Sequence, residues 1–329
     1  MRITENGLQD NLTDAELNKL LISFVKENNP MGIKTLIEIG ADPCARNLED
    51  DSEETKDMRA LTLALYLDHP LCVKELLDAG ADIFDRDIMN TNKPALIEAV
   101  KNNNSQSIPT IVKHLEHIDM PCYHGFGNLL SIAATQKNKR AIDMLLSLGA
   151  DVDGKCTIDD ETIDYEYGVL NHIVMSNLST NDKIDMITFM SSRGANPDGI
   201  FGEHIPYPYE IAAHHDLQLL QWFCSTNTDI ELKGREAILA AAAFNNVEVV
   251  QWLAENEFNL NVKRKNGLTP IMLTALHNCK ESAQILLSHN VKVDLDECLK
   301  IALENNHQDM VDFFLEAGAS SEILESSKN

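Results

Sequence analysis

The sequence predicts an all-α solenoid of about nine helix–turn–helix units. Two observations support this prediction. A Gly-Ala-Asp marker, or a weaker form of it, recurs along the chain at intervals of 28 to 45 residues. Between the markers, helix-start signals and runs of large apolar residues follow in the same order each time. Self-similarity at a period of roughly 20–50 residues indicates stacked repeats, in which each unit packs on its neighbours.

The marker divides the chain into units. Its clear copies begin at Gly40, Gly80, Gly149, Gly194 and Gly318, and its weaker copies begin at His117, Asn227, Glu257 and Asn290. Glycine suits this position because it adopts the positive φ with which many helices end. We expect a single array, with an N-terminal capping unit at about 13–42, repeats at about 43–295, a C-terminal capping unit at about 296–320 and a polar tail at 321–329.

Residues 266–294 show one whole unit. Thr269 and Pro270 predict a helix start, because threonine caps free backbone amides and proline needs no amide hydrogen at the first helical position. The apolar run 285–287 predicts a second helix that is buried against neighbouring units. Small residues recur in the first helix of the units and let the helices approach closely: Ala64, Ala99, Ala133, Ala212, Ala241, Ala275 and Ala302.

The two ends of the array carry their own signals. Thr13 and Glu16 form a capping-box pattern that opens the first helix. Asp296 and Glu297 open a helix that we expect to end near Asn305. The tail from residue 320 onward is polar, and we expect it to be frayed.

The repeating unit, with Gly-x-Thr-Pro at its first helix and Gly-Ala-Asp after its second, resembles the ankyrin repeat. The resemblance is most specific in the last units and looser in the third, fifth and sixth. It implies that the connections between units are β-hairpins, called fingers, which project toward a concave face. It also implies a non-catalytic module that recognises one folded protein partner and acts as an inhibitor, an adaptor or a targeting factor.

Composition limits the partners further. The formal net charge of −25 disfavours nucleic acid and anionic membrane surfaces, both of which attract basic proteins. No apolar run is long enough for a membrane span, and the polar N-terminal stretch is unlike a signal peptide. Seven scattered cysteines suit a reducing, cytoplasmic compartment. The negative charge serves solubility, as in many acidic solenoids, or it steers the protein toward a basic protein partner.

Departures from the repeat point to a binding surface. The connections at 42–60 and 151–168 are overlong and acidic, and insertions in repeat proteins often lie on the binding face. Aromatic residues gather in the connections, where the repeat needs no large apolar group. The predicted partner-binding residues are Phe84, Arg86, Tyr123, Phe126, Tyr165, Tyr167, Phe201, His204 and Tyr207. The alternative is that each ring packs on the base of its own finger. Lys263-Arg264-Lys265 is an isolated basic spot, predicted at a finger tip.

Motifs for catalysis, phosphate binding or a resident cofactor are missing, so we expect neither an enzyme nor a cofactor. His114, His117, Cys122 and His124 are the densest metal-like group, but they lack the spacing of a four-ligand zinc site. The acidic run 159–161 lacks a calcium ligand ladder. The rival hypothesis is an enzyme whose site is built into the irregular units around 114–126 or 199–215.

Residue usage bears on origin. The chain has 29 asparagines, and its 19 lysines exceed its 8 arginines, which favours an AT-rich genome. Ankyrin proteins of this kind resemble effectors that intracellular bacteria deliver into the host cytosol. The serine- and glutamate-rich stretch 316–327 resembles a C-terminal type IV secretion signal, although it also suits an ordinary frayed end. Such an effector would bind a host protein or regulate another effector.

Overall fold

A computed structural model describes most of the chain. The described residues are 12–49, 52, 54–83, 95–101, 106–120, 127–160, 163–197, 207–226, 229–289 and 291–326. They form two compact units. Unit 1 comprises Met1–Ser176 and Phe189–Ala195, and unit 2 comprises Asn177–Thr188 and Asn196–Asn329. Each unit is a stack of helix pairs, as the repeating pattern predicts.

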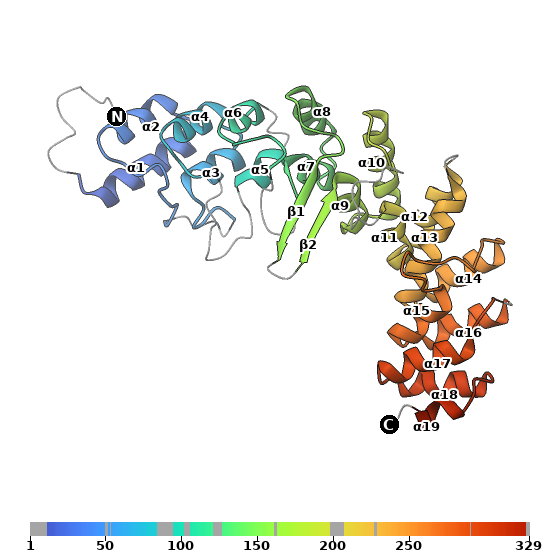
Figure 1. Cartoon of the computed structure of the whole chain (residues 1–329). Helices are drawn as coiled ribbons and strands as arrows, with labels where there is room; N and C mark the ends of the chain where they lie inside the picture. The colour runs from blue at the N-terminus through green and yellow to red at the C-terminus, as the bar shows by residue number, and fades with distance from the viewer. Residues whose placement is uncertain are drawn as a thin grey trace. The chain divides into compact units, whose positions relative to one another are not determined.

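Unit 1 stacks its helices in two rows (Figure 1). The inner row holds the first helix of each pair: α1 (Asp14–Lys26), α3 (Ala60–Tyr66), α5 (Ala95–Lys101), α7 (Leu129–Thr135) and α9 (Val169–Met175). The outer row holds the second helix: α2 (Pro30–Glu38), α4 (Pro70–Asp78), α6 (Ile108–Lys113) and α8 (Lys139–Ser147). Inner helices contact inner helices along the stack, and outer helices contact outer helices.

A β-hairpin joins α8 to α9. Its strands β1 (Lys155–Asp160) and β2 (Ile163–Gly168) pair antiparallel. Figure 1 shows the hairpin extending from the inner row, away from the outer row. The sequence predicted fingers of this kind, and this hairpin carries one of the two overlong acidic connections.

Unit 2 continues the same alternation. Its inner helices are α11 (Pro208–His215), α13 (Ile230–Ala243), α15 (Pro270–His277) and α17 (Leu295–Glu304). Its outer helices are α12 (Leu217–Ser225), α14 (Val247–Glu255), α16 (Lys280–Ser288) and α18 (Gln308–Glu316), followed by the short α19 (Glu322–Ser326). With α10 (Thr180–Ser192), the described residues hold nine helix pairs, which confirms the predicted all-α architecture.

The helix-start signals work as the sequence predicts. Glu16 Oε2 accepts a hydrogen bond from the backbone amide of Thr13 at 2.8 Å, and Thr13 Oγ1 accepts one from the amide of Glu16, which completes the capping box of α1. Thr269 Oγ1 accepts from the amide of Met272, ahead of Pro270 at the first position of α15. These side chains satisfy amides that a helix cannot pair internally.

The core runs along the interior of each stack. All seven alanines singled out from the sequence are buried, none of them more than 1% exposed. Large apolar side chains such as Leu76, Leu145 and Leu286 fill the space between outer and inner helices and are fully buried. Burying one such side chain contributes about 1.5–3 kcal/mol, so stability grows as units are added.

A recurring hydrogen bond connects five of the repeats to the repeat before them. In five pairs, the residue at the N-cap of the outer helix reaches back to a carbonyl near the end of the preceding inner helix. The bonds run from His69 to Val25, Asn138 to Val100, Asn246 to Ala213, Cys279 to Ala243 and His307 to Ala275. Each bond brings a side-chain donor to a carbonyl in the last turn of an inner helix, where the intrahelical pairing is incomplete.

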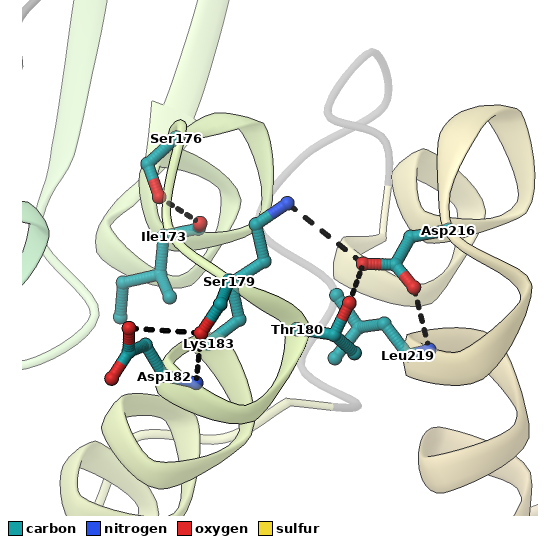
Figure 2. A network of polar contacts seen from close by, with 8 residues as sticks. All are labelled: Ile173, Ser176, Ser179, Thr180, Asp182, Lys183, Asp216 and Leu219. Atoms are coloured by element: carbon teal, nitrogen blue, oxygen red, sulfur yellow. Dashed lines mark hydrogen bonds and ion pairs between the residues drawn. The ribbon is translucent and has the colours of Figure 1, made fainter.

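Asp216 holds the start of α10 within unit 2 (Figure 2). Its Oδ2 accepts a hydrogen bond from Thr180 Oγ1 at 2.9 Å and lies 3.9 Å from Lys183 Nζ. Its Oδ1 accepts from the amide of Leu219 at 2.9 Å and so caps α12.

In unit 1, Arg193 makes a bidentate ion pair with Asp143, with N–O distances of 3.0 and 3.2 Å.

Two features differ from expectation. The tail is not simply frayed, because residues 322–326 form the short helix α19, which contacts α17. The inner helix α13 has 14 residues, whereas α15 has 8, and only four residues separate α13 from α12. A longer helix therefore replaces the finger at this point of the stack.

Candidate protein-binding surface

The β1–β2 finger contains two of the tyrosines that the sequence singles out, Tyr165 and Tyr167, both on strand β2. Tyr165 pairs with Ile158 and Tyr167 pairs with Cys156 in the antiparallel register. Strands of this length, at about 3.3 Å per residue, carry a finger roughly 20 Å from its base. A partner lying against the inner helices of unit 1 would therefore meet this finger.

Tyr167 lies at the finger base and is half-buried. Its ring packs edge-on against the ring of His172 on α9, with centroids 6.2 Å apart. His172 is only 7% exposed, and burial lowers its pKa to about 4, so the imidazole is neutral at pH 7. Tyr167 thus covers an inner-helix residue while part of its ring stays open to solvent.

Polar side chains gather beside His172. Within the described part of the chain, His172 Nε2, Ser131 Oγ and Asn128 Nδ2 are buried and make no hydrogen bond. Gly127, with φ of +76°, permits this close arrangement. A Cβ there would lie 2.7 Å from His172 Nε2 and 2.9 Å from Ser131 Oγ. Unpaired buried polar groups cost about 1–3 kcal/mol each, so the finger base is less stable than an apolar core.

Tyr207 plays a related part in unit 2. It precedes α11, is half-buried, and stacks on the ring of Tyr209 with centroids 4.9 Å apart. On α11, burial and the nearby charge of Glu236 together raise the pKa of Glu210 to about 7, although a hydrogen bond with the backbone of Tyr207 and the charge of Arg264 oppose the shift. Glu210, Glu236 and Arg264 thus place interacting charges among the inner helices of unit 2.

The first acidic connection, residues 42–60, contacts helices α1 and α3 of unit 1. Glu49 forms an ion pair with Lys19 of α1. Glu54 Oε2 accepts a hydrogen bond from the hydroxyl of Tyr66 at 2.7 Å, and this bond raises the pKa of Tyr66. Asp50, Asp51 and Glu53 lie outside the described residues, so their role as a steering charge stays a prediction.

Six of the predicted contact residues also lie outside the described residues: Phe84, Arg86, Tyr123, Phe126, Phe201 and His204. For Tyr165 the structure gives the strand and its register. The two tyrosines that are described more fully, Tyr167 and Tyr207, both pack partly on their own unit. The aromatic edge therefore stays a hypothesis, with local packing as the alternative for each ring.

Several of the cysteines and histidines that could react or bind a metal are buried or already paired where the structure describes them. Burial raises the pKa of Cys72 and of Cys224 to about 11 and that of Cys298 to about 12, so these thiols are protonated at pH 7 and are weak nucleophiles. His114 Nδ1 donates to the carbonyl of Thr110, and its Nε2 lies 3.5 Å from Asp78. Among the described residues, no three His, Cys, Asp or Glu side chains gather as a metal site. Cys122 and His124 lie outside them.

The comparisons with known proteins bear on the helix pairs of unit 2. A family model described as ankyrin repeats in three copies matches residues 209–297 and again 238–324. Residues 209–324 carry ankyrin repeats. The helix pairs of the described residues form an all-α solenoid, which is consistent with an ankyrin-repeat fold. A comparison with curated proteins finds no match.

Ankyrin repeats indicate a module for protein–protein interaction. None of the helices that the structure describes is both long and apolar enough to span a bilayer. A protein partner is therefore the class of ligand that the repeats support.

Sequence reasoning overlooked Glu210 and the first turns of α13. A signal for α13 was present, because no Thr-Pro pair precedes it and its markers, at Asn227 and Glu257, are only 30 residues apart. A short spacing with no helix-start dipeptide indicates that the finger is missing. The burial of Glu210 depends on packing between α11 and α13, which the sequence pattern does not reveal.

Proposed function

We propose that this ankyrin-repeat protein is a non-catalytic recognition module that binds one folded, basic protein partner and acts as an inhibitor, adaptor or targeting factor. The observation that carries the proposal is the β1–β2 finger, which projects from the inner row with Tyr167 at its base. Aromatic rings that are partly open to solvent, set among polar groups, are typical anchors of protein interfaces.

The proposed contact edge comprises Phe84, Arg86, Tyr123, Phe126, Tyr165, Tyr167, Phe201, His204 and Tyr207. The net charge of −25 supports a basic partner, whose approach an acidic surface accelerates. The asparagine-rich, lysine-rich composition and the polar tail support a secreted bacterial effector, or a regulator of another effector, as the biological setting. An enzyme built around 114–126 or 199–215 is the rival, and much of both stretches lies outside the described residues.

The test begins with capture of a partner from host and bacterial lysates, followed by affinity measurement with the purified pair. Tyr165→Ala with Tyr167→Ala should weaken binding at least about tenfold, because truncating anchor residues costs about 2 kcal/mol or more. Phe244→Ala is the matched control, since this aromatic residue is 60% exposed, lies at the C-terminal end of α13 and is not among the predicted contact residues.

Melting temperature is measured alongside affinity. Loss of binding with an unchanged melting temperature supports the finger edge. Normal binding with a much earlier melting transition would show that the tyrosines are packing residues only. Equal loss of binding in the Phe244 control would show that the partner does not distinguish the finger from the rest of the surface.

A further inference from the structure

Unit 2 contains a surface groove at the point where the finger is replaced by helix. Its cavity volume is about 820 Å³, and it is open to solvent rather than enclosed. The lining comes from the end of α12, the first two turns of α13, the end of α14 and the segment 257–262. This volume lies within the range of ligand-binding clefts, roughly 300–1,000 Å³.

The walls of the groove are fixed by two close contacts. Lys233 is 1% exposed, and its Nζ donates to the carbonyl of Phe223 at 2.8 Å and to Thr226 Oγ1 at 2.9 Å, which holds the start of α13 to the end of α12. Gly234 lets Phe258 approach α13, since a Cβ there would lie 2.1 Å from the ring. The groove is therefore a built feature of these helices.

The floor is apolar and partly open. The ring of Trp252 packs on that of Phe258, with centroids 5.4 Å apart, and both are half-buried. Ile230, in the first turn of α13, is 50% exposed. A large apolar residue exposed beside two rings offers an anchor site for an aliphatic or aromatic side chain.

The rim is acidic. Asp229, Glu231 and Glu257 line the groove and are exposed, whereas Arg235 is its one lining cation among the described residues. Arg235 already pairs with Glu236 at 2.6 Å. Asp229 caps α13 by accepting from the amide of Leu232, so the positive end of the helix partly offsets its charge. Glu231 and Glu257 are left as the carboxylates that face an incoming ligand.

We propose that this groove binds a basic segment of another protein, in which one aliphatic or aromatic side chain lies beside lysine or arginine. The apolar side chain would pack on Ile230, Trp252 and Phe258, and the cations would face Glu231 and Glu257. Charge complementarity selects this occupant over an acidic or a neutral segment. The site is separate from the finger edge and extends the proposed function to a second contact surface.

The test uses Trp252 as the reporter. The chain has two tryptophans, so a Trp222→Phe background leaves Trp252 as the only one. Three labelled probe peptides are titrated: alternating lysine and leucine, alternating glutamate and leucine, and alternating lysine and serine. Fluorescence anisotropy of the label gives affinity, and Trp252 emission reports whether the groove is occupied.

The lysine–leucine peptide should bind with a change in Trp252 emission, and the other two should bind at least about tenfold more weakly. Glu231→Lys with Glu257→Lys should weaken the lysine–leucine peptide about tenfold and reverse the preference toward glutamate–leucine. Glu304→Lys with Glu316→Lys is the matched control, because it makes the same charge change at exposed residues outside the groove lining. Ile230→Ser tests the apolar anchor at an exposed site.

Several outcomes would overturn the proposal. Equal weakening by the control pair would mean that the peptide senses only the overall negative charge. Equal binding of the lysine–serine peptide, or no effect of Ile230→Ser, would remove the apolar anchor. Binding that leaves Trp252 emission unchanged would place the peptide elsewhere. The Tyr165 and Tyr167 double variant should bind the probe normally, so this test and that of the finger edge fail independently.

Discussion

His172 should make the stability of unit 1 depend on pH. Burial lowers the pKa of this histidine from 6.5 to about 4 in the folded protein. Between these two values the unfolded chain binds a proton that the folded chain does not, so acid favours unfolding. The stability is fully present above pH 6.5 and falls as the pH drops toward 4.

The size of the effect follows from the shift. The full difference corresponds to about 3 kcal/mol, of which about 2 kcal/mol is already lost at pH 5. A loss of that size is a sizeable part of the stability of an ordinary domain, about 5–15 kcal/mol. The neighbouring Ser131 Oγ and Asn128 Nδ2 are neutral groups, buried without a hydrogen-bond partner, and supply no negative charge that would stabilise an imidazolium.

The assay is urea unfolding of the full chain followed by circular dichroism at a series of pH values. Both tryptophans lie in unit 2, so fluorescence follows that unit separately. His172→Gln removes the titrating group, and the difference between wild type and variant isolates its contribution from all other groups. If the two proteins show the same slope between pH 6.5 and 4, the buried, neutral histidine described above is wrong.

Three further predictions concern other parts of the chain. Glu210 should act in the opposite direction, because its pKa is raised from 4.5 to about 7: its contribution to stability is present below pH 4.5 and is lost, by about 3 kcal/mol, as the pH rises through 7. Glu210→Gln, but not the exposed Glu248→Gln, should remove this dependence when unfolding is followed by tryptophan fluorescence. Gly234→Ala should destabilise unit 2 by about 1–3 kcal/mol in the same unfolding assay, because the new Cβ meets the ring of Phe258; an unchanged midpoint would show that the ring has room to move. Neutralising the acidic residues 49–51 together should slow association with the captured partner and flatten its salt dependence, and an unaltered on-rate would rule out steering by this connection.

The repeat architecture could be predicted because it is encoded locally and many times over. Thr269 and Pro270 mark a helix start by their own chemistry, and the buried alanines recur at the same place in each unit. Even where the marker is degraded, as at Asn227, the neighbouring units set the register. A repeat with a degraded marker can therefore still fold within the stack, and it can still be identified from the sequence.

The exposure of the aromatic residues in the connections could be predicted only in part, because it depends on packing within and between repeats. The pattern placed Tyr167 and Tyr207 in connections, but it did not reveal that each ring packs on His172 or Tyr209. The groove beside α13 was overlooked because a missing finger leaves no motif of its own. The burial of Lys233 was equally hidden, since a lysine in the first turns of a helix ordinarily faces solvent.

In five helix pairs the N-cap of the outer helix donates a hydrogen bond to the preceding inner helix, which bears on how this array could be recombined with foreign repeats. A repeat grafted after α15 should fit best with a side-chain donor at the position of His307, because that donor pairs with the carbonyl of Ala275. Asparagine or histidine meets that requirement, whereas aspartate caps its own helix but has no hydrogen to give. Grafts made at the opposite end face a different demand, since the new unit must then offer an acceptor to His69. The two ends of the array therefore have different requirements. A repeat added at the C-terminal end should supply a hydrogen-bond donor, and a repeat added at the N-terminal end should supply an acceptor.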